Sequence, residues 1–328
     1  MADSDKHAKY FFTAGINDKN KRIDLFLASN LSLQSRTFIQ KIIEGKYVTV
    51  NGLTVHKNYK LSADDKISVS YDDGHFLPAE KGLLPQEIPL KIRYEDDYLL
   101  IISKDAGITV HPAAGIYTNT LVNALLFYLG KTVSDFDAGS RPGIVHRLDK
   151  YTSGLMIIAK NGDVQHKISE LFKKREVYKV YKTLVLGNFS ESKGKIKLPV
   201  GRSKTDRKKM DIIPDTGREA ETEFEVIEKL KYATLLKAMP KTGRTHQIRV
   251  HFNSIGHPVI GDRDYGNIQT RKIADSIGLE RQFLHSCAIS FIHPVLKKKI
   301  EITDNLADDL LKSLSNLKKM IYNKEYKE

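Results

Sequence analysis

The chain has 328 residues, which is long enough to bury a sizeable core and favours two domains over one. Lys and Arg outnumber Asp and Glu by 53 − 40 = 13, and the sequence pI is about 9.4. This excess of positive charge favours a polyanionic partner such as nucleic acid, although a lysine-rich genome would produce the same balance.

The first residues, the lack of long apolar runs and the single cysteine narrow the class of protein further. Residues 1–6 contain no apolar signal segment, and no apolar run approaches the ~20 residues of a membrane helix. Cys287 alone excludes an internal disulfide framework and a cysteine-based zinc site, and its apolar neighbours are typical of a core residue. We expect a cytoplasmic protein without membrane contact. The oligomeric state leaves no mark in the sequence, and we take the chain as a monomer.

The first patterned segment, residues 20–71, begins with two helices. Ile23, Phe26 and Leu27 fall on one helical face, and residues 38–43 show the same spacing before Gly45 ends the second helix. Polar side chains occupy the other face of that helix, and they are positioned to donate to phosphates: Arg36, Gln40 and Lys41.

A hairpin and a further strand complete this segment. In residues 47–55, Asn51 and Gly52 supply the positive φ angles of a tight type I′ turn. The residues that carry a family resemblance are Arg22-Ile-Asp-x-Phe-Leu27, Ser35-Arg36, Ile42-x-x-Gly45 and Val48-x-Val-Asn-Gly52. This pattern resembles the S4-like RNA-binding domain, which implies such a domain over residues 20–72. The alternative is a small α/β cap that binds nothing. Residues 73–88 are charged and rich in turn formers, as a linker would be.

From residue 89 onward, short strands and helices alternate irregularly. Strand patterns occupy residues 98–102, 155–159, 181–186, 221–227 and 232–238, and helical spacing occupies residues 121–129, 164–172 and 306–321. Regular βαβ alternation is absent, which indicates an α+β fold with a mixed, largely antiparallel sheet. The chain contains no Gly-x-Gly-x-x-Gly run and no Walker loop, so nucleotide cofactors receive little support.

Residues 146–149, His-Arg-Leu-Asp, follow a glycine-bearing turn and precede a buried strand. A carboxylate beside an arginine at the mouth of a strand can be kept ionised and directed at a substrate. Taken alone, the four residues favour a structural Arg–Asp pair that closes a turn.

Three further segments complete a pattern around this loop: residues 95–112, residues 179–187, and residues 242–251 with 256–266. Together the four segments resemble the RluA-type RNA pseudouridine synthases, and among them the RluD-like branch that modifies large-subunit ribosomal RNA. The match spans roughly residues 20 to 300. It implies a pseudouridine synthase fold with a central mixed, largely antiparallel sheet over residues 89–324, in addition to the small N-terminal α/β S4-like domain.

The resemblance also implies a role for individual residues. Asp149 matches the catalytic aspartate, Tyr181 the tyrosine that packs on the target base, and Arg249 the arginine that pairs with the aspartate. Arg147 matches the arginine that enters the RNA helix as the base leaves it, and we expect His146 and Arg244 to contact RNA beside it. Such enzymes need neither a metal nor an organic cofactor.

Other interpretations remain open at this point. The histidines at 146, 246 and 251 share no recognised ligand spacing with a carboxylate or cysteine, which disfavours a metal site, and we expect His246 and Gln247 to order their loop. The basic stretch of residues 202–209 is consistent with either a solvated loop or phosphate contact. The alternative to an enzyme is a non-catalytic RNA-binding or ribosome-assembly factor that keeps the fold.

Two positions depart from the family pattern. The family usually has proline where this chain has Asp105, and an acidic residue where it has Tyr151. Both changes lie outside the residues assigned to chemistry, but they can alter loop geometry and the RNA site recognised.

Overall fold

In the computed structural model of the chain, the residues that the structure describes are 7–31, 36–72, 83–111, 118–131, 136, 141–206 and 208–325. They form two compact units. Among these residues, no helix is both long and apolar enough to cross a membrane.

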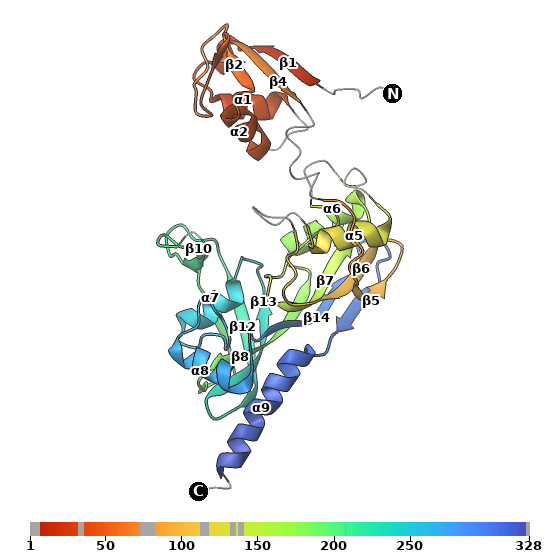
Figure 1. Cartoon of the computed structure of the whole chain (residues 1–328), viewed down its shortest axis with the longest axis vertical. Helices are drawn as coiled ribbons and strands as arrows, with labels where there is room; N and C mark the ends of the chain where they lie inside the picture. Colours follow the sequence, from red (N-terminus) through yellow and green to blue (C-terminus); the bar gives the residue numbers. More distant parts are fainter. Residues whose placement is uncertain are drawn as a thin grey trace. The chain divides into compact units, whose positions relative to one another are not determined.

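The N-terminal unit is an antiparallel sheet with two helices (Figure 1). Its elements are β1 (His7–Thr13), the short 3-10 helix η1 (Ile16–Asp18), α1 (Ile23–Asn30), α2 (Arg36–Glu44), β2 (Val48–Val50), β3 (Leu53–Thr54) and β4 (Lys66–Asp72). The strand order is β1-β4-β2-β3. The apolar faces of both helices pack on this sheet, with Ile23, Leu27 and Ile42 fully buried.

Both predicted helices and the predicted hairpin are confirmed. Asn51 and Gly52 have φ values of 51° and 81°, as a type I′ turn requires. The structure adds β1, which lies before the predicted start of the domain and pairs along its whole length with β4. The predicted linker, residues 73–88, falls largely on residues 73–82, which lie outside the described residues. The three domain bounds therefore stay predictions.

The larger unit contains the remaining elements. They are β5 (Lys91–Glu95), β6 (Leu99–Lys104), α5 (Leu121–Leu129), β7 (Ser153–Ala159), α6 (Gly162–Lys173), β8 (Tyr178–Leu186), β9 (Lys193–Lys197), β10 (Val200–Arg202), β11 (Met210–Ile212), β12 (Glu221–Lys229), β13 (Ala233–Pro240), α7 (Gln247–Ser254), α8 (Ile268–Ile277), β14 (Leu284–Ile292), β15 (Lys299–Thr303) and α9 (Asp308–Glu325).

A nine-stranded sheet organises this unit (Figure 1). The strand order is β5-β6-β7-β14-β8-β13-β12-β9, and β15 pairs with β14. Only the β7–β14 pair is parallel, whereas the other pairs of this sheet are antiparallel. The predicted α+β class with a mixed, largely antiparallel sheet is confirmed.

Two apolar cores hold the helices against the sheet. In the first, α6 places Val164 and Ile168 against apolar residues of β6, β7, β14 and β15. In the second, α8 and α9 pack on β8 and β13, and Phe283 is fully buried among them. Each apolar side chain that is buried in this way stabilises the fold by about 1.5–3 kcal/mol. The two cores fix β7 and β8, which lie on either side of β14 and lead into the pocket described next.

Candidate active site

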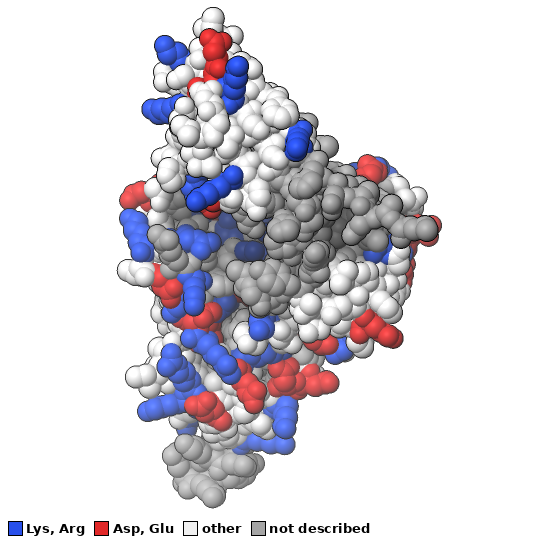
Figure 2. All heavy atoms as spheres, turned by 45° about the horizontal axis from the view of Figure 1, so that its top comes forward, with Lys and Arg blue, Asp and Glu red and all other residues white. Residues whose placement is uncertain are grey.

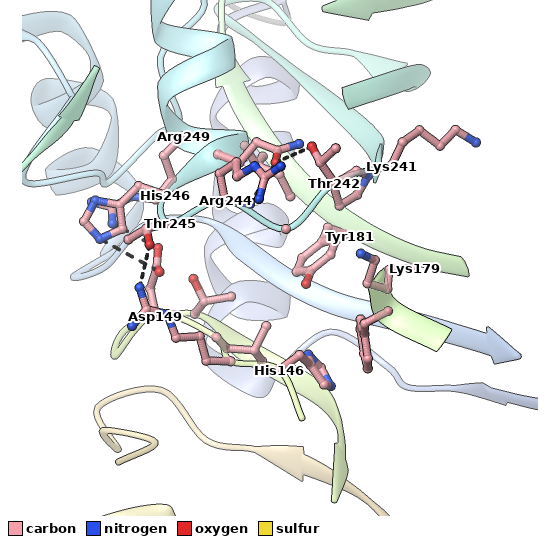
Figure 3. A pocket seen from close by; sticks show the side chains of 18 of the residues that line it. His146, Asp149, Lys179, Tyr181, Lys241, Thr242, Arg244, Thr245, His246 and Arg249 are labelled. Carbon is pink, nitrogen blue, oxygen red and sulfur yellow. Dashed lines mark hydrogen bonds and ion pairs between the residues drawn. The ribbon is translucent and has the colours of Figure 1, made fainter. Parts of the chain in front are cut away.

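A pocket of about 470 Å³ lies in the larger unit (Figure 3). Three segments form most of its wall: residues 145–149 before β7, the first half of β8, and residues 240–249, which run from the end of β13 into the first turn of α7. These segments are far apart in the sequence. The sheet brings them together because β14 pairs with β7 on one side and with β8 on the other, and β13 lies next to β8. The volume of the pocket is in the range of pockets that hold small ligands.

Asp149 lies in this pocket beside Arg249, as the resemblance implied. Asp149 Oδ2 accepts a hydrogen bond of 3.1 Å from Arg249 Nη1. The other oxygen, Oδ1, is 3.9 Å from His246 Nε2 (Figure 3). The Asp149 side chain is about one-fifth exposed, whereas that of Arg249 is almost completely buried. One carboxylate oxygen is thus oriented by the arginine while the carboxylate still reaches the pocket.

Arg249 is itself held by two further carboxylates. Asp262 binds it with both oxygens, at 2.6 Å from Nε and 2.7 Å from Nη2, and Asp264 binds Nη2 as well. Burial alone would lower the pKa of Arg249, but the bonds and charge of Asp262 and the charge of Asp149 raise it above its ordinary value. The guanidinium is therefore permanently charged, and its fork geometry fixes the direction in which it meets Asp149.

The backbone that follows Asp149 is clamped by donors from distant segments. Asp149 O accepts from Thr152 N at 3.0 Å, which closes a turn. Within this turn, Lys150 O accepts from Gly107 N and from the buried Lys104 Nζ, and Tyr151 O accepts from Arg281 Nη1. Burial, with the charge of Arg281, lowers the pKa of Lys104 to about 7. These bonds make the Asp149 turn part of the rigid sheet scaffold.

The two departures from the family pattern lie away from the pocket lining. Asp105 forms an ion pair with Lys91 at 2.8 Å, and both side chains are at least half exposed. The Tyr151 side chain is also exposed, and Lys150 Nζ lies 5.4 Å from its ring. An exposed ion pair of this kind contributes about 0–1 kcal/mol, so the Asp105–Lys91 pair adds little to stability.

The loop between β13 and α7 is ordered by Gln247. Its side chain accepts from Thr242 Oγ1 at 2.7 Å and from Arg244 N at 3.0 Å, and it donates to Glu221 O and to Thr222 Oγ1 on β12. His246, which has a φ of 54°, shares a hydrogen bond with the hydroxyl of Tyr265. The structure thus confirms that His246 and Gln247 order this loop.

Tyr181 lies on the wall of the same pocket. It is on β8 between Ala238 of β13 and Ser286 of β14, and its side chain is 8% exposed. Burial raises the pKa of its hydroxyl well above the ordinary value, so the phenol is neutral. A neutral ring held by two neighbouring strands is suited to packing against a flat base.

The predicted RNA contacts divide into two groups. His146, Arg147 and Arg244 line the pocket together with Asp149. Arg147 Nη2 donates to Thr245 Oγ1, and Arg244 Nε donates to Glu219 O. Arg36 and Lys41 lie on α2 of the N-terminal unit, and their side chains fall outside the described residues.

His146 has a structural bond in addition to its place in the pocket. Its Nε2 accepts from Ile157 N of β7 at 2.9 Å, and its ring stacks on Phe172 with centroids 4.7 Å apart. Burial, with the nearby charge of Lys179, lowers the pKa of His146 to about 3. His146 is therefore neutral, and an RNA contact by this residue would use its Nδ1–H.

Three residues of the site lie within the segments that carry the family resemblance, but the sequence alone assigned them no role. Asp262 and Asp264 follow α7 and hold Arg249, and no spacing rule links them to it. Lys179 lines the pocket two residues before Tyr181 on β8. Side chains two residues apart in a strand share a face, so the sequence did contain a signal for Lys179.

The basic stretch 202–209 lies mainly in the loop between β10 and β11. Lys209 Nζ donates to Asp264 O at 2.6 Å, and Met210 N donates to the hydroxyl of Tyr265. These bonds attach the hairpin to the segment that holds Arg249. Whether the remaining lysines contact phosphate stays open as a prediction. Among the described residues, no three His, Cys, Asp or Glu side chains are grouped as a metal site would require.

Comparison with known families assigns both parts of the chain. Residues 98–254 match the family model described as RNA pseudouridylate synthase, and residues 21–67 match the S4 domain. Together these matches cover the pocket segments and both helices of the N-terminal unit.

Curated relatives match over nearly the whole chain. An uncharacterized RNA pseudouridine synthase of Chlorobaculum parvum is 39% identical, over 88% of this chain and 91% of its own length. A ribosomal large subunit pseudouridine synthase D of Zymomonas mobilis is 37% identical over the same shares. Among solved structures, human RNA Pseudouridylate Synthase Domain Containing 1 aligns with a TM-score of 0.53 and 27% identity, over 67% of this chain and 84% of that one.

Proposed function

The chain belongs to the RNA pseudouridine synthase family, and from that premise we propose that it converts specific uridines of large-subunit ribosomal RNA to pseudouridine, with Asp149 as its catalytic carboxylate. The N-terminal S4 domain identifies RNA as the ligand class. The choice of ribosomal RNA rests on relatives that are named ribosomal large subunit pseudouridine synthase D and are 34–38% identical.

The observation that carries the proposal is the state of Asp149. It is a carboxylate that reaches the pocket, is bonded through one oxygen to a permanently charged guanidinium, and is fixed by a clamped turn. A purely structural Arg–Asp pair would need no access to a cavity. Proximity and a fixed direction of approach are what a carboxylate contributes to catalysis.

The reaction breaks the bond from ribose carbon 1′ to nitrogen 1 of uracil and joins carbon 1′ to carbon 5. Asp149 can assist in two ways: as a nucleophile that adds to carbon 1′, or as a base that removes a ribose proton and opens an elimination route. In both, the carboxylate must be ionised, and the Arg249 guanidinium lies beside it at 3.1 Å. The proton on carbon 5 is lost and one is gained on nitrogen 1, so the product is an isomer of the substrate.

Tyr181 and Arg147 have complementary tasks in this proposal. A uridine in a folded RNA must leave its stack before the pocket can receive it. The Tyr181 ring packs against the detached uracil, and the exposed Arg147 at the pocket rim enters the space that the base vacates. Lys and Arg side chains on the face shown in Figure 2 are available for phosphate contacts, and they are interspersed with acidic ones.

The proposed substrate is tested by nucleoside mass spectrometry. Transcripts of large-subunit and small-subunit ribosomal RNA from one organism are incubated with the full chain, digested and compared. We expect pseudouridine in the large-subunit transcript only. Because maturation can expose the target within a particle, assembling large subunits form a second arm. Pseudouridine in neither large-subunit arm, or equal amounts in both transcripts, would contradict the proposed substrate.

A further inference from the structure

The basic side chains of the pocket differ in whether they have a hydrogen-bond acceptor or an anionic partner. Six of them have an oxygen acceptor within the described protein: Arg147, Lys173, Arg175, Lys241, Arg244 and Arg249. For Lys179, the described residues provide no hydrogen-bond acceptor and no carboxylate partner. Its ammonium has instead a ring beneath it, with Nζ 5.6 Å from the centroid of Phe172.

Lys179 is nevertheless buried. The residue is 8% exposed and lines the pocket, so its ammonium has been removed from most of its water without a compensating anion. Desolvating an ammonium is costly unless it is paired, and lysine is rarely buried for that reason. Burial lowers the pKa of Lys179 to about 8, so at pH 7 most molecules still have the charge. The missing partner is therefore expected to arrive with the substrate.

The position of Lys179 indicates which part of the substrate it meets. It is two residues before Tyr181 on β8 and points to the same side of the sheet. Figure 3 shows its amino group beside the Tyr181 ring, across the pocket from Asp149. Given the proposed stacking of uracil on Tyr181, a base in that position lies within the reach of Lys179, while the ribose faces Asp149.

Cleavage of the bond between carbon 1′ and nitrogen 1 leaves its electron pair on the uracil. The detached base is an anion, and its charge spreads from nitrogen 1 onto the carbonyl oxygens at carbons 2 and 4. This charge develops whether Asp149 acts as nucleophile or as base. Arg249 already shares its donors among three carboxylates, so it has little capacity left for a further anion.

We propose that Lys179 is a further catalytic residue, whose ammonium binds a carbonyl oxygen of the target uracil and stabilises the uracil anion during its detachment. This inference rests on the proposed function. A preorganised cation in a partly dry pocket interacts more strongly with charge that develops in the transition state than with the neutral base. When carbon 5 has bonded to carbon 1′ and nitrogen 1 has regained a proton, the charge disappears and the product can leave.

The test is a single-turnover comparison at saturating enzyme, on a large-subunit ribosomal RNA fragment that contains the modified position. Lys179→Met removes the charge and keeps the length, and Lys179→Arg keeps the charge. Lys182→Met is the matched control, because it lies on the same strand with its side chain on the opposite face. We expect Lys179→Met to slow turnover by about 100-fold, the loss typical of one donor to a developing anion. Lys179→Arg should retain much of the rate, and Lys182→Met nearly all of it.

A second RNA separates charge stabilisation from a structural role. In a fragment made with 5-fluorouridine, fluorine withdraws electrons and makes the base a better leaving group. The anion then needs less help, and Lys179→Met should lose distinctly less than on uridine, as measured by mass spectrometry of the rearranged nucleoside. Equal losses on both RNAs would indicate a folding or positioning defect and would overturn the inference.

The outcomes also distinguish the two proposals. No product from the unchanged enzyme on the uridine fragment would contradict the proposed function, and this inference with it. Normal turnover by the unchanged enzyme with an equally fast Lys179→Met variant would contradict this inference alone.

Discussion

Removing Arg249 should destabilise the larger unit because of Asp262. The Asp262 side chain is fully buried, and its carboxylate also accepts from the backbone N–H groups of Asp264 and Tyr265. In Arg249→Met this buried carboxylate loses the cation that it is paired with. Breaking a buried pair in this way costs about 3–5 kcal/mol. At roughly 2–4 °C per kcal/mol for a unit of this size, Tm should fall by roughly 6–20 °C.

A second substitution should restore the stability without restoring the activity. In Arg249→Met with Asp262→Asn, no unpaired charge is buried, and the amide oxygen still accepts from the backbone. Replacing both members of a buried pair is often neutral, so we expect most of the lost stability to return. Turnover should remain low, because Asp149 still lacks the Nη1 donor 3.1 Å away that orients it.

Thermal unfolding gives Tm and urea-induced unfolding gives the free energy of unfolding, and both are followed by far-ultraviolet circular dichroism because the chain has no tryptophan. Single-turnover rates are measured on the same preparations. A stable Arg249→Met variant would refute the argument that this substitution leaves Asp262 as a buried charge without a partner. A double variant that recovers both stability and turnover would show that Asp149 does not depend on Arg249.

Three further predictions test other parts of the site. Gly154 has a φ of +110°, and a Cβ there would meet Ser286 O at 2.3 Å, so Gly154→Ala should cost at least about 1–3 kcal/mol and lower turnover by moving the start of β7; an unchanged urea midpoint would count against this. Burial lowers the pKa of His285 to about 4, from 6.5 in the unfolded chain. Between pH 6.5 and 4 the unfolded chain therefore binds more protons than the folded chain. The stability that the neutral, buried His285 contributes is present above pH 6.5 and is lost as the pH falls toward 4. In urea titrations at several pH values, His285→Asn should make the free energy of unfolding depend less on pH between 6.5 and 4. An equally steep dependence in the variant would exclude His285 as its source. Finally, Asp149→Asn should abolish turnover but leave RNA affinity largely intact, since phosphate contacts dominate binding; strongly weakened retention in a filter-binding titration would contradict this.

Local patterns in the sequence were sufficient to predict most of the helices and strands of the N-terminal unit. Helical spacing, the stop at Gly45 and the Asn51-Gly52 turn are short-range signals, and the structure confirms each of them. β1 was missed because it becomes a strand only by pairing with β4, whose partner residues lie 53 to 65 positions later in the chain. Such pairing leaves little trace in a seven-residue window.

In the larger unit, the missed strand is the one that assembles the site. β14 had been noted only as an apolar run around Cys287, yet it lies between β7 and β8 and pairs with both. The residues of one strand do not reveal its neighbours in a sheet with crossovers. The sequence could therefore nominate Asp149, Tyr181 and Arg249 by resemblance, but their common pocket follows only from the strand order.

The carboxylates around Arg249 show the same limit. Asp262 and Asp264 are 13 and 15 residues from the arginine that they hold, at a spacing that belongs to no helix or strand. A buried cation needs anions, but the sequence does not specify which of the many acidic residues will be near it. That choice is made by the turn after α7.

The most direct test of the account is tritium release from RNA labelled at carbon 5 of uridine. Full-length large-subunit transcripts and assembling subunits are treated with the unchanged protein and with Asp149→Asn, after circular dichroism has shown both to be folded. We predict release with the unchanged protein and none above background with the variant. Equal release by both would remove Asp149 from its proposed role, and no release from either substrate would contradict the proposed reaction on this RNA.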